Sequence, residues 1–212
     1  MSGFIFDMDG TLIDSMGVWY DFGQRYAKQR GLPGDEDWQK PLKTMSLELG
    51  AQYVKEHFAL PESTAEILQQ WAVLIAQLYR ERAVPKPGAV EFLQEHRGQP
   101  QVVLTANGRP ILEGVMRGMG FAPWLDATYT AAELGLEKDN PEIYRQTARL
   151  MGLQPEECVV FEDTLHAILA AKQAGCRVVA VADHTYPEDV AAIRAAADYY
   201  IHDFVELRDI PL

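Results

Sequence analysis

Short apolar runs recur along the chain, and segments with helical periodicity separate most of them. Five runs have the character of buried parallel strands, and a sixth is typical of an edge strand: residues 4–8, 102–105, 127–130, 159–161, 178–181 and 199–202. Helices are predicted between them over residues 88–97, 110–118, 141–151 and 165–174. This alternation predicts an α/β fold with a parallel sheet and right-handed crossovers.

One long segment, residues 15–84, interrupts this alternation. It contains no convincing strand, and amphipathic helical patterns cover residues 16–29, 46–58 and 63–82. Ser63 followed by Glu66 is a capping-box signature that marks the start of the third pattern. The sequence therefore predicts a helical domain inserted after the first strand, with residues 1–14 and 85–212 forming the α/β core. Residues 84–88 are interpreted as the return linker, stiffened by two prolines.

Composition narrows the classes of function. The chain has 212 residues, of which 48% are hydrophobic, enough for one large core or a core with a smaller domain. Its formal net charge of -12 disfavours binding to nucleic acid or to an anionic membrane. The chain has no apolar run of about 20 residues, and a strand that begins near residue 3 leaves no room for a signal peptide. We expect a cytoplasmic protein, a monomer or weak dimer, whose two cysteines are buried thiols.

Polar residues gather where the predicted strands end. Asp7 and Asp9 close the first strand, and a second strand ends at Thr105, followed by Ala106 and Asn107. A further strand ends at Glu162 and Asp163, and Lys138 precedes it. The carboxyl ends of parallel strands share one edge of a sheet, so these groups are expected to converge. Clustered acids need a cation, and carboxylates suit Mg²⁺, whereas a hydroxyl, backbone amides and a lysine suit a phosphoryl group.

Four motifs in this order resemble those of the haloacid dehalogenase superfamily, in the branch of small phosphatases and β-phosphoglucomutase-like proteins with a helical cap. They are FDMDGT at residues 6–11, LTAN at 104–107, Lys138 with Pro141, and FEDT at 161–164 leading to AAKQAG at 170–175. The resemblance covers essentially the whole chain. It implies a Rossmann-like core, and it places the family's cap in the helical insertion.

The resemblance also implies roles for these residues. Asp7 would attack phosphorus and form an aspartyl-phosphate, and Asp9 would serve as general acid and then general base. The Asp7 side chain, the Asp9 backbone carbonyl and Asp163 would bind Mg²⁺, with Glu162 acting either through a bound water or as a residue that supports the ligands. Thr105, the amide of Ala106 and Lys138 would hold the phosphoryl oxygens. Asn107 is either a substrate contact or part of a turn with Gly108.

The expected function is hydrolysis of a small phosphomonoester, a sugar phosphate or related metabolite. A sugar phosphomutase is the first alternative, but Leu47 occupies the cap position where the mutases carry a phosphate-binding arginine. A non-catalytic phosphometabolite-binding protein is the second alternative, although every polar catalytic group is present. A calcium loop starting at Asp7 is disfavoured because its twelfth position is Val18 rather than Glu. The candidate substrate contacts near the cap hinge and the cap loop are Ser15, Trp19, Lys43 and Met45.

Overall fold

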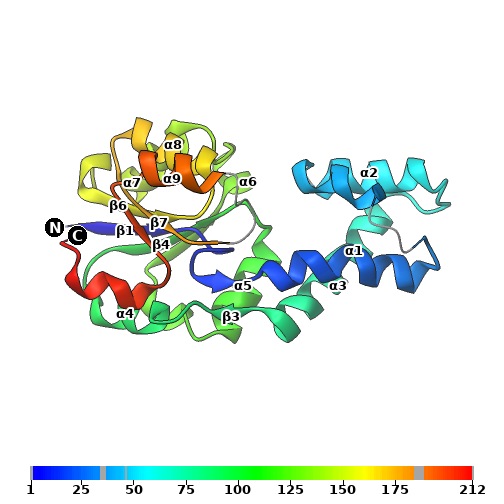
Figure 1. The fold of residues 1–212 in the computed structure, drawn as a ribbon, viewed down its shortest axis with the longest axis horizontal. Coiled ribbons are helices and arrows are strands. Elements are labelled where there is room, and N and C mark those ends of the chain that lie inside the picture. The colour runs from blue at the N-terminus through cyan, green and yellow to red at the C-terminus, as the bar shows by residue number, and fades with distance from the viewer. Residues whose placement is uncertain (1, 34–36, 46, 184–188, 212) are drawn as a thin grey trace. The chain divides into compact units, whose positions relative to one another are not determined.

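The computed structural model describes residues 2–33, 37–45, 47–183 and 189–211 (Figure 1). The chain forms two compact units. One contains residues 1–16 and 84–212, and the other contains residues 17–83.

A six-stranded parallel sheet forms the centre of the first unit, with the strand order β5-β4-β1-β6-β7-β8. The strands are β1 Gly3–Phe6, β4 Gln101–Thr105, β5 Ala127–Thr130, β6 Cys158–Glu162, β7 Arg177–Val181 and β8 Tyr199–Ile201. All six predicted strands are confirmed, with ends within two residues of the expected positions. Because β1 lies between β4 and β6, the residues after it lie at the middle of the carboxyl edge.

Helices cover both faces of this sheet. Helices α7 (Pro141–Leu150), α8 (Leu165–Ala174) and α9 (Val190–Ala196) lie on one face, and α4 (Ala89–Glu95) and α5 (Arg109–Gly118) lie on the other (Figure 1). The α/β prediction is confirmed. The short helices α6 (Ala131–Leu134) and α9 were not expected, nor were the 3-10 turns Ala122–Trp124, Pro155–Glu157 and Phe204–Asp209.

Successive side chains of β1 point to opposite faces of the sheet, so the strand contributes to the hydrophobic core on both. Ile5 joins the cluster beneath α7, α8 and α9, whereas Phe4 and Phe6 face a group of aromatic rings on the other side. Phe6 stacks on Phe161 with ring centroids 4.8 Å apart. Each fully buried side chain of this size stabilises the fold by about 1.5–3 kcal/mol. The strand that leads to Asp7 is therefore held from both sides.

The second unit is helical. It contains α1 (Met16–Arg30), a 3-10 segment Asp37–Thr44, α2 (Leu47–His57) and α3 (Thr64–Arg82). Trp71 packs edge-on against Phe22 and Tyr26, with ring centroids 5.1 and 5.6 Å apart. The predicted capping box is confirmed, since the Glu66 amide donates to the Ser63 hydroxyl and the Ser63 amide donates to the Glu66 carboxylate.

A short antiparallel pair marks where the chain leaves the first unit and returns to it. Strand β2 (Ile13–Asp14) pairs with β3 (Val84–Pro85), and the amide of Lys86 donates to the Leu12 carbonyl over 2.9 Å. Neither strand was expected from the sequence, because Pro85 lies inside one and each contains only two residues.

Cys158 and Cys176 are both free and buried, as predicted, and burial raises the pKa values of their thiols to about 11 and about 12. Across the described residues, every helix is too short or too polar to cross a membrane.

Candidate active site

The candidate active site lies at the carboxyl edge of β1, β4 and β6. Asp7 follows β1 directly, and its amide extends the strand ladder by donating to the Phe161 carbonyl over 3.0 Å. Glu162 is the last residue of β6, and Thr105 is the last residue of β4. Asp7, Glu162 and Thr105 are all buried, at 8%, 1% and 1% exposure. Polar groups this deep need charge or hydrogen-bond partners.

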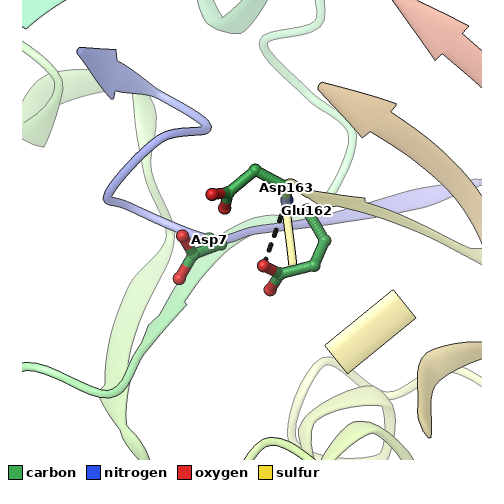
Figure 2. A group of neighbouring side chains, drawn as sticks. All are labelled: Asp7, Glu162 and Asp163. Carbon is green, nitrogen blue, oxygen red and sulfur yellow. Dashed lines mark hydrogen bonds between the residues drawn. The ribbon is translucent and has the colours of Figure 1, made fainter. Parts of the chain in front are cut away.

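Three carboxylates converge at this edge, where Figure 2 shows Asp7, Glu162 and Asp163 gathered around a common space. One oxygen from each side chain lies within 4.8 Å of the others. Burial raises the pKa of Asp7 to about 8, with Lys138 opposing the shift and Glu162 and Asp9 adding to it. Burial, followed by the charges of Glu162 and Asp7, raises the pKa of Asp163 well above its ordinary value. This donor set fits a hard divalent cation, which would compensate the crowded negative charge.

Lys138 neutralises part of this cluster. It lies in the loop between α6 and α7, and its Nζ donates to Asp7 Oδ1 over 2.6 Å and to Glu162 Oε2. Burial disfavours the ammonium form, but the adjacent charges of Asp7 and Glu162 raise the pKa of Lys138 well above its ordinary value. A buried lysine held charged beside a candidate nucleophile is suited to binding an anionic group.

Glu162 has hydrogen-bond partners on both of its oxygens. Oε1 accepts from the amides of Asp163 and Thr164, each over 3.1 Å, and from the Thr164 hydroxyl over 2.9 Å. Oε2 accepts from Lys138. Burial raises the pKa of Glu162, but Lys138 and these hydrogen bonds outweigh it, so the net shift is downward. This carboxylate is therefore engaged in fixing the lysine and the turn that carries Asp163.

Gly10 and Thr11 shape the site in a way that the sequence analysis did not specify. The Thr11 hydroxyl donates to Asp163 Oδ1 over 3.2 Å. Gly10 has φ +77°, and a Cβ built there would lie 2.4 Å from Asp163 Oδ2. A glycine after paired acids was the available signal, because only glycine combines this backbone with so close an approach.

The end of β4 brings the predicted phosphoryl-binding residues beside the acids. The Asn107 amide donates to Thr105 Oγ1 over 3.1 Å, which folds the chain sharply after the strand. The Asn107 side chain then crosses to the loop after β1, where Nδ2 donates to Asp9 Oδ2 over 2.5 Å. Ala106, between them, is exposed. The structure thus joins Asp9 to Asn107, a pairing that the spacing did not indicate.

Arg109, which the sequence analysis overlooked, anchors this loop. Its guanidinium donates to the Thr128 hydroxyl over 2.6 Å, to the Thr128 carbonyl over 2.8 Å and to Glu133 Oε1 over 2.8 Å. These hydrogen bonds tie the first residue of α5 to β5 and α6. An arginine that opens a helix gives no signal of such a contact, because its partners lie 19 and 24 residues away.

The remaining candidates are Ser15, which directly precedes α1 in the sequence, and three residues of the second unit. Ser15 is buried, and its hydroxyl has no hydrogen-bond partner among the described residues. Trp19, on α1, packs edge-on against Phe22 and Tyr79 of its own unit. Met45 is half-buried, and the Lys43 side chain lies outside the described part of the chain. Substrate contact by these residues stays a prediction.

Comparison with known proteins identifies the class. The family model for haloacid dehalogenase-like hydrolases matches residues 1–175. Hexitol phosphatase A of Escherichia coli is 31% identical over 185 residues, covering 84% of this chain and 82% of the relative. Fructose-1-phosphate phosphatase of the same organism is 28% identical, covering 85% and 96%.

The fold agrees with solved structures of this class. A family IA hydrolase from Entamoeba histolytica superposes with a TM-score of 0.79 at 21% identity, covering 97% of this chain and 95% of that one. The protein is thus a hydrolase with a Rossmann-like core and an inserted helical unit. It belongs to the haloacid dehalogenase-like family.

Proposed function

We propose that this hydrolase is a Mg²⁺-dependent phosphatase acting on a small phosphomonoester. The proposal rests on the surroundings of Asp7 at the end of β1. Lys138 donates a hydrogen bond to the Asp7 carboxylate, and an oxygen of Asp163 lies within 4.8 Å of it. A buried carboxylate, an adjacent fixed cation and a cation-binding set of oxygens are what phosphoryl transfer to an aspartate requires.

Asp7 is assigned as the nucleophile. Its carboxylate oxygen forms a bond to phosphorus as the bond from phosphorus to the leaving oxygen breaks, giving an aspartyl-phosphate. Asp9 gives its proton to the leaving oxygen and then takes one from the water that attacks phosphorus and releases Asp7. The Thr105 hydroxyl, the Ala106 amide and Lys138 hold the phosphoryl oxygens, and Asn107 lies beside them.

The side chains of Asp7 and Asp163 and the backbone carbonyl of Asp9 are the proposed Mg²⁺ ligands. When bound, the ion supplies positive charge that neutralises the phosphoryl oxygens. Glu162 is proposed to support the Mg²⁺ ligands without binding the ion directly, because its oxygens accept hydrogen bonds from Lys138 and from the amides after β6. Its role is to keep Asp163 and Lys138 in position.

The proposed substrate class is a sugar phosphate or a sugar-alcohol phosphate. The support comes from two relatives whose names specify a hexitol phosphatase and a fructose-1-phosphate phosphatase. Residues 17–83 are proposed as a cap that excludes bulk water and selects the substrate. Leu47 supports hydrolysis over phosphomutase activity, because an aliphatic side chain cannot pair with a second phosphate.

A substrate panel tests this function. Purified protein is incubated with glucose 1-phosphate, glucose 6-phosphate, fructose 1-phosphate, sorbitol 6-phosphate and p-nitrophenyl phosphate, with Mg²⁺ or with EDTA. Phosphorus NMR should show inorganic phosphate that appears only with Mg²⁺. Conversion of glucose 1-phosphate to glucose 6-phosphate would indicate a mutase instead, and the absence of any turnover would refute both enzymatic functions.

A further inference from the structure

The Asn107 side chain reaches from the loop after β4 to the carboxylate of Asp9, 98 positions away in the sequence. Nδ2 of Asn107 and Oδ2 of Asp9 are 2.5 Å apart. We propose that Asn107 is a positioning residue that holds the Asp9 carboxyl in the orientation needed for proton transfer to the leaving group. This assignment rests on the proposed phosphatase function and gives Asn107 a role other than binding the substrate.

The loop that carries Asn107 is built to hold it in place. Its backbone amide is hydrogen-bonded to Thr105 Oγ1, so the residue is fixed to the end of a buried strand. Two residues later, Arg109 is anchored through its side chain to Thr128 and Glu133. Because the backbone is restrained before and after Asn107, its side-chain amide can hold a flexible carboxyl group in one orientation.

The contact also selects one oxygen of the general acid. An N–H donor hydrogen-bonds to an unprotonated oxygen, so Asn107 disfavours a proton on Oδ2 of Asp9. The proton of the acid form is then carried by Oδ1. In the first half-reaction it moves from Oδ1 to the leaving oxygen as that oxygen separates from phosphorus, and Asp9 becomes a carboxylate. In the second, the attacking water returns a proton to Asp9.

Leaving-group dependence separates this role from a contact with the phosphoryl group. A sugar alkoxide needs a proton to depart, whereas p-nitrophenolate leaves readily without one. A residue that orients the acid should matter for the first substrate and little for the second. A residue that binds the phosphoryl oxygens should matter equally for both, because the transferred group is the same.

The test compares wild type with Asn107→Ala and with Asn107→Leu, which keeps a similar shape and loses the donor without adding a charge. Values of kcat/KM are measured for p-nitrophenyl phosphate and for the best sugar phosphate of the panel, since this ratio reports on formation of the aspartyl-phosphate. Asn140→Ala is the matched control, because it removes the same amide group from an exposed position, where Oδ1 accepts from the Glu142 amide. Thermal melting of each variant verifies that it folds.

Both Asn107 variants should lose about 10- to 100-fold on the sugar phosphate and less than about threefold on the aryl phosphate. The control should match wild type on both substrates. An equal loss on the two substrates, or no loss on either, would overturn the positioning role while leaving the phosphatase assignment intact. A wild-type protein that hydrolyses neither substrate would refute the proposed function and the role of Asn107 with it.

Discussion

The carboxylates that crowd the end of β1 are stabilised by a few fixed hydrogen-bond donors. Lys138 compensates Asp7 and Glu162 directly, and Thr11 hydrogen-bonds to Asp163. Gly10 permits this closeness, since its missing side chain leaves room for the Asp163 carboxylate. The geometry of the site therefore depends on a small residue as much as on the charged ones.

Replacing Gly10 with alanine should strain the backbone and should also lower activity by displacing Asp163. A non-glycine residue in the left-handed region costs roughly 1–2 kcal/mol. The new Cβ would also displace Asp163, and a shift of this kind should lower kcat/KM by about 100-fold. Gly120→Ala is the matched control, because Gly120 has φ +76° and open space around its Cβ position. Similar kinetics for the two variants would argue against a steric role for Gly10.

Removing one acid from the cluster should stabilise the metal-free protein. The pKa of Asp163 is higher in the folded protein than in the unfolded chain. At pH 7, which is above the unfolded-state pKa, the cost of ionising Asp163 in the folded protein therefore lowers stability. Asp163→Asn should raise the melting temperature in EDTA, by about 2–4 °C for each kcal/mol of relieved repulsion. In wild type, Mg²⁺ should raise the melting temperature because it binds only the folded protein. Asp163→Asn should abolish this increase.

The exposed acid Asp139 supplies the control for this experiment. Asp139→Asn removes the same charge and should keep both the wild-type melting temperature and its response to Mg²⁺. A metal response that persists in Asp163→Asn would exclude Asp163 as a ligand.

At the scale of elements, the six strands of the parallel sheet could be predicted from short apolar runs, most clearly the buried strands β1, β4 and β6. The rule that ligands bind at the carboxyl ends of parallel strands indicated which residues to examine. Contacts that depend on loop geometry could not be predicted this way. The reach of Asn107 to Asp9 and the anchoring of Arg109 join residues whose spacing carries no periodic signal.

Helix capping is an element-level feature that the sequence did reveal. Ser63→Ala removes the acceptor for the Glu66 amide at the start of α3 and should cost about 1 kcal/mol. The resulting drop in melting temperature should be about 2–4 °C. Ser63→Thr keeps the acceptor and should melt close to wild type. Equal melting of the alanine variant and wild type would show that the cap contributes no stability.

The whole molecule combines a parallel core, which carries the candidate active site, with a helical insertion. The core motifs are local in sequence, so the family and the residues that converge at the candidate site could be anticipated. The insertion carries few such motifs. Its aromatic residues Phe22, Tyr26 and Trp71 form its own core, and substrate selectivity cannot be derived from them. Motif-based reasoning therefore predicted the chemistry more fully than the substrate.

The central claim, that Asp7 becomes phosphorylated during turnover, can be tested by trapping the intermediate. Wild-type protein with Mg²⁺ and its best substrate is quenched in acid within milliseconds, and the modified peptide is identified by mass spectrometry. We predict one hydroxylamine-sensitive phosphoryl group on Asp7, absent from Asp7→Asn and present in Asp139→Asn. Rapid turnover without a covalent phosphoryl group, or with the group on another residue, would contradict the account.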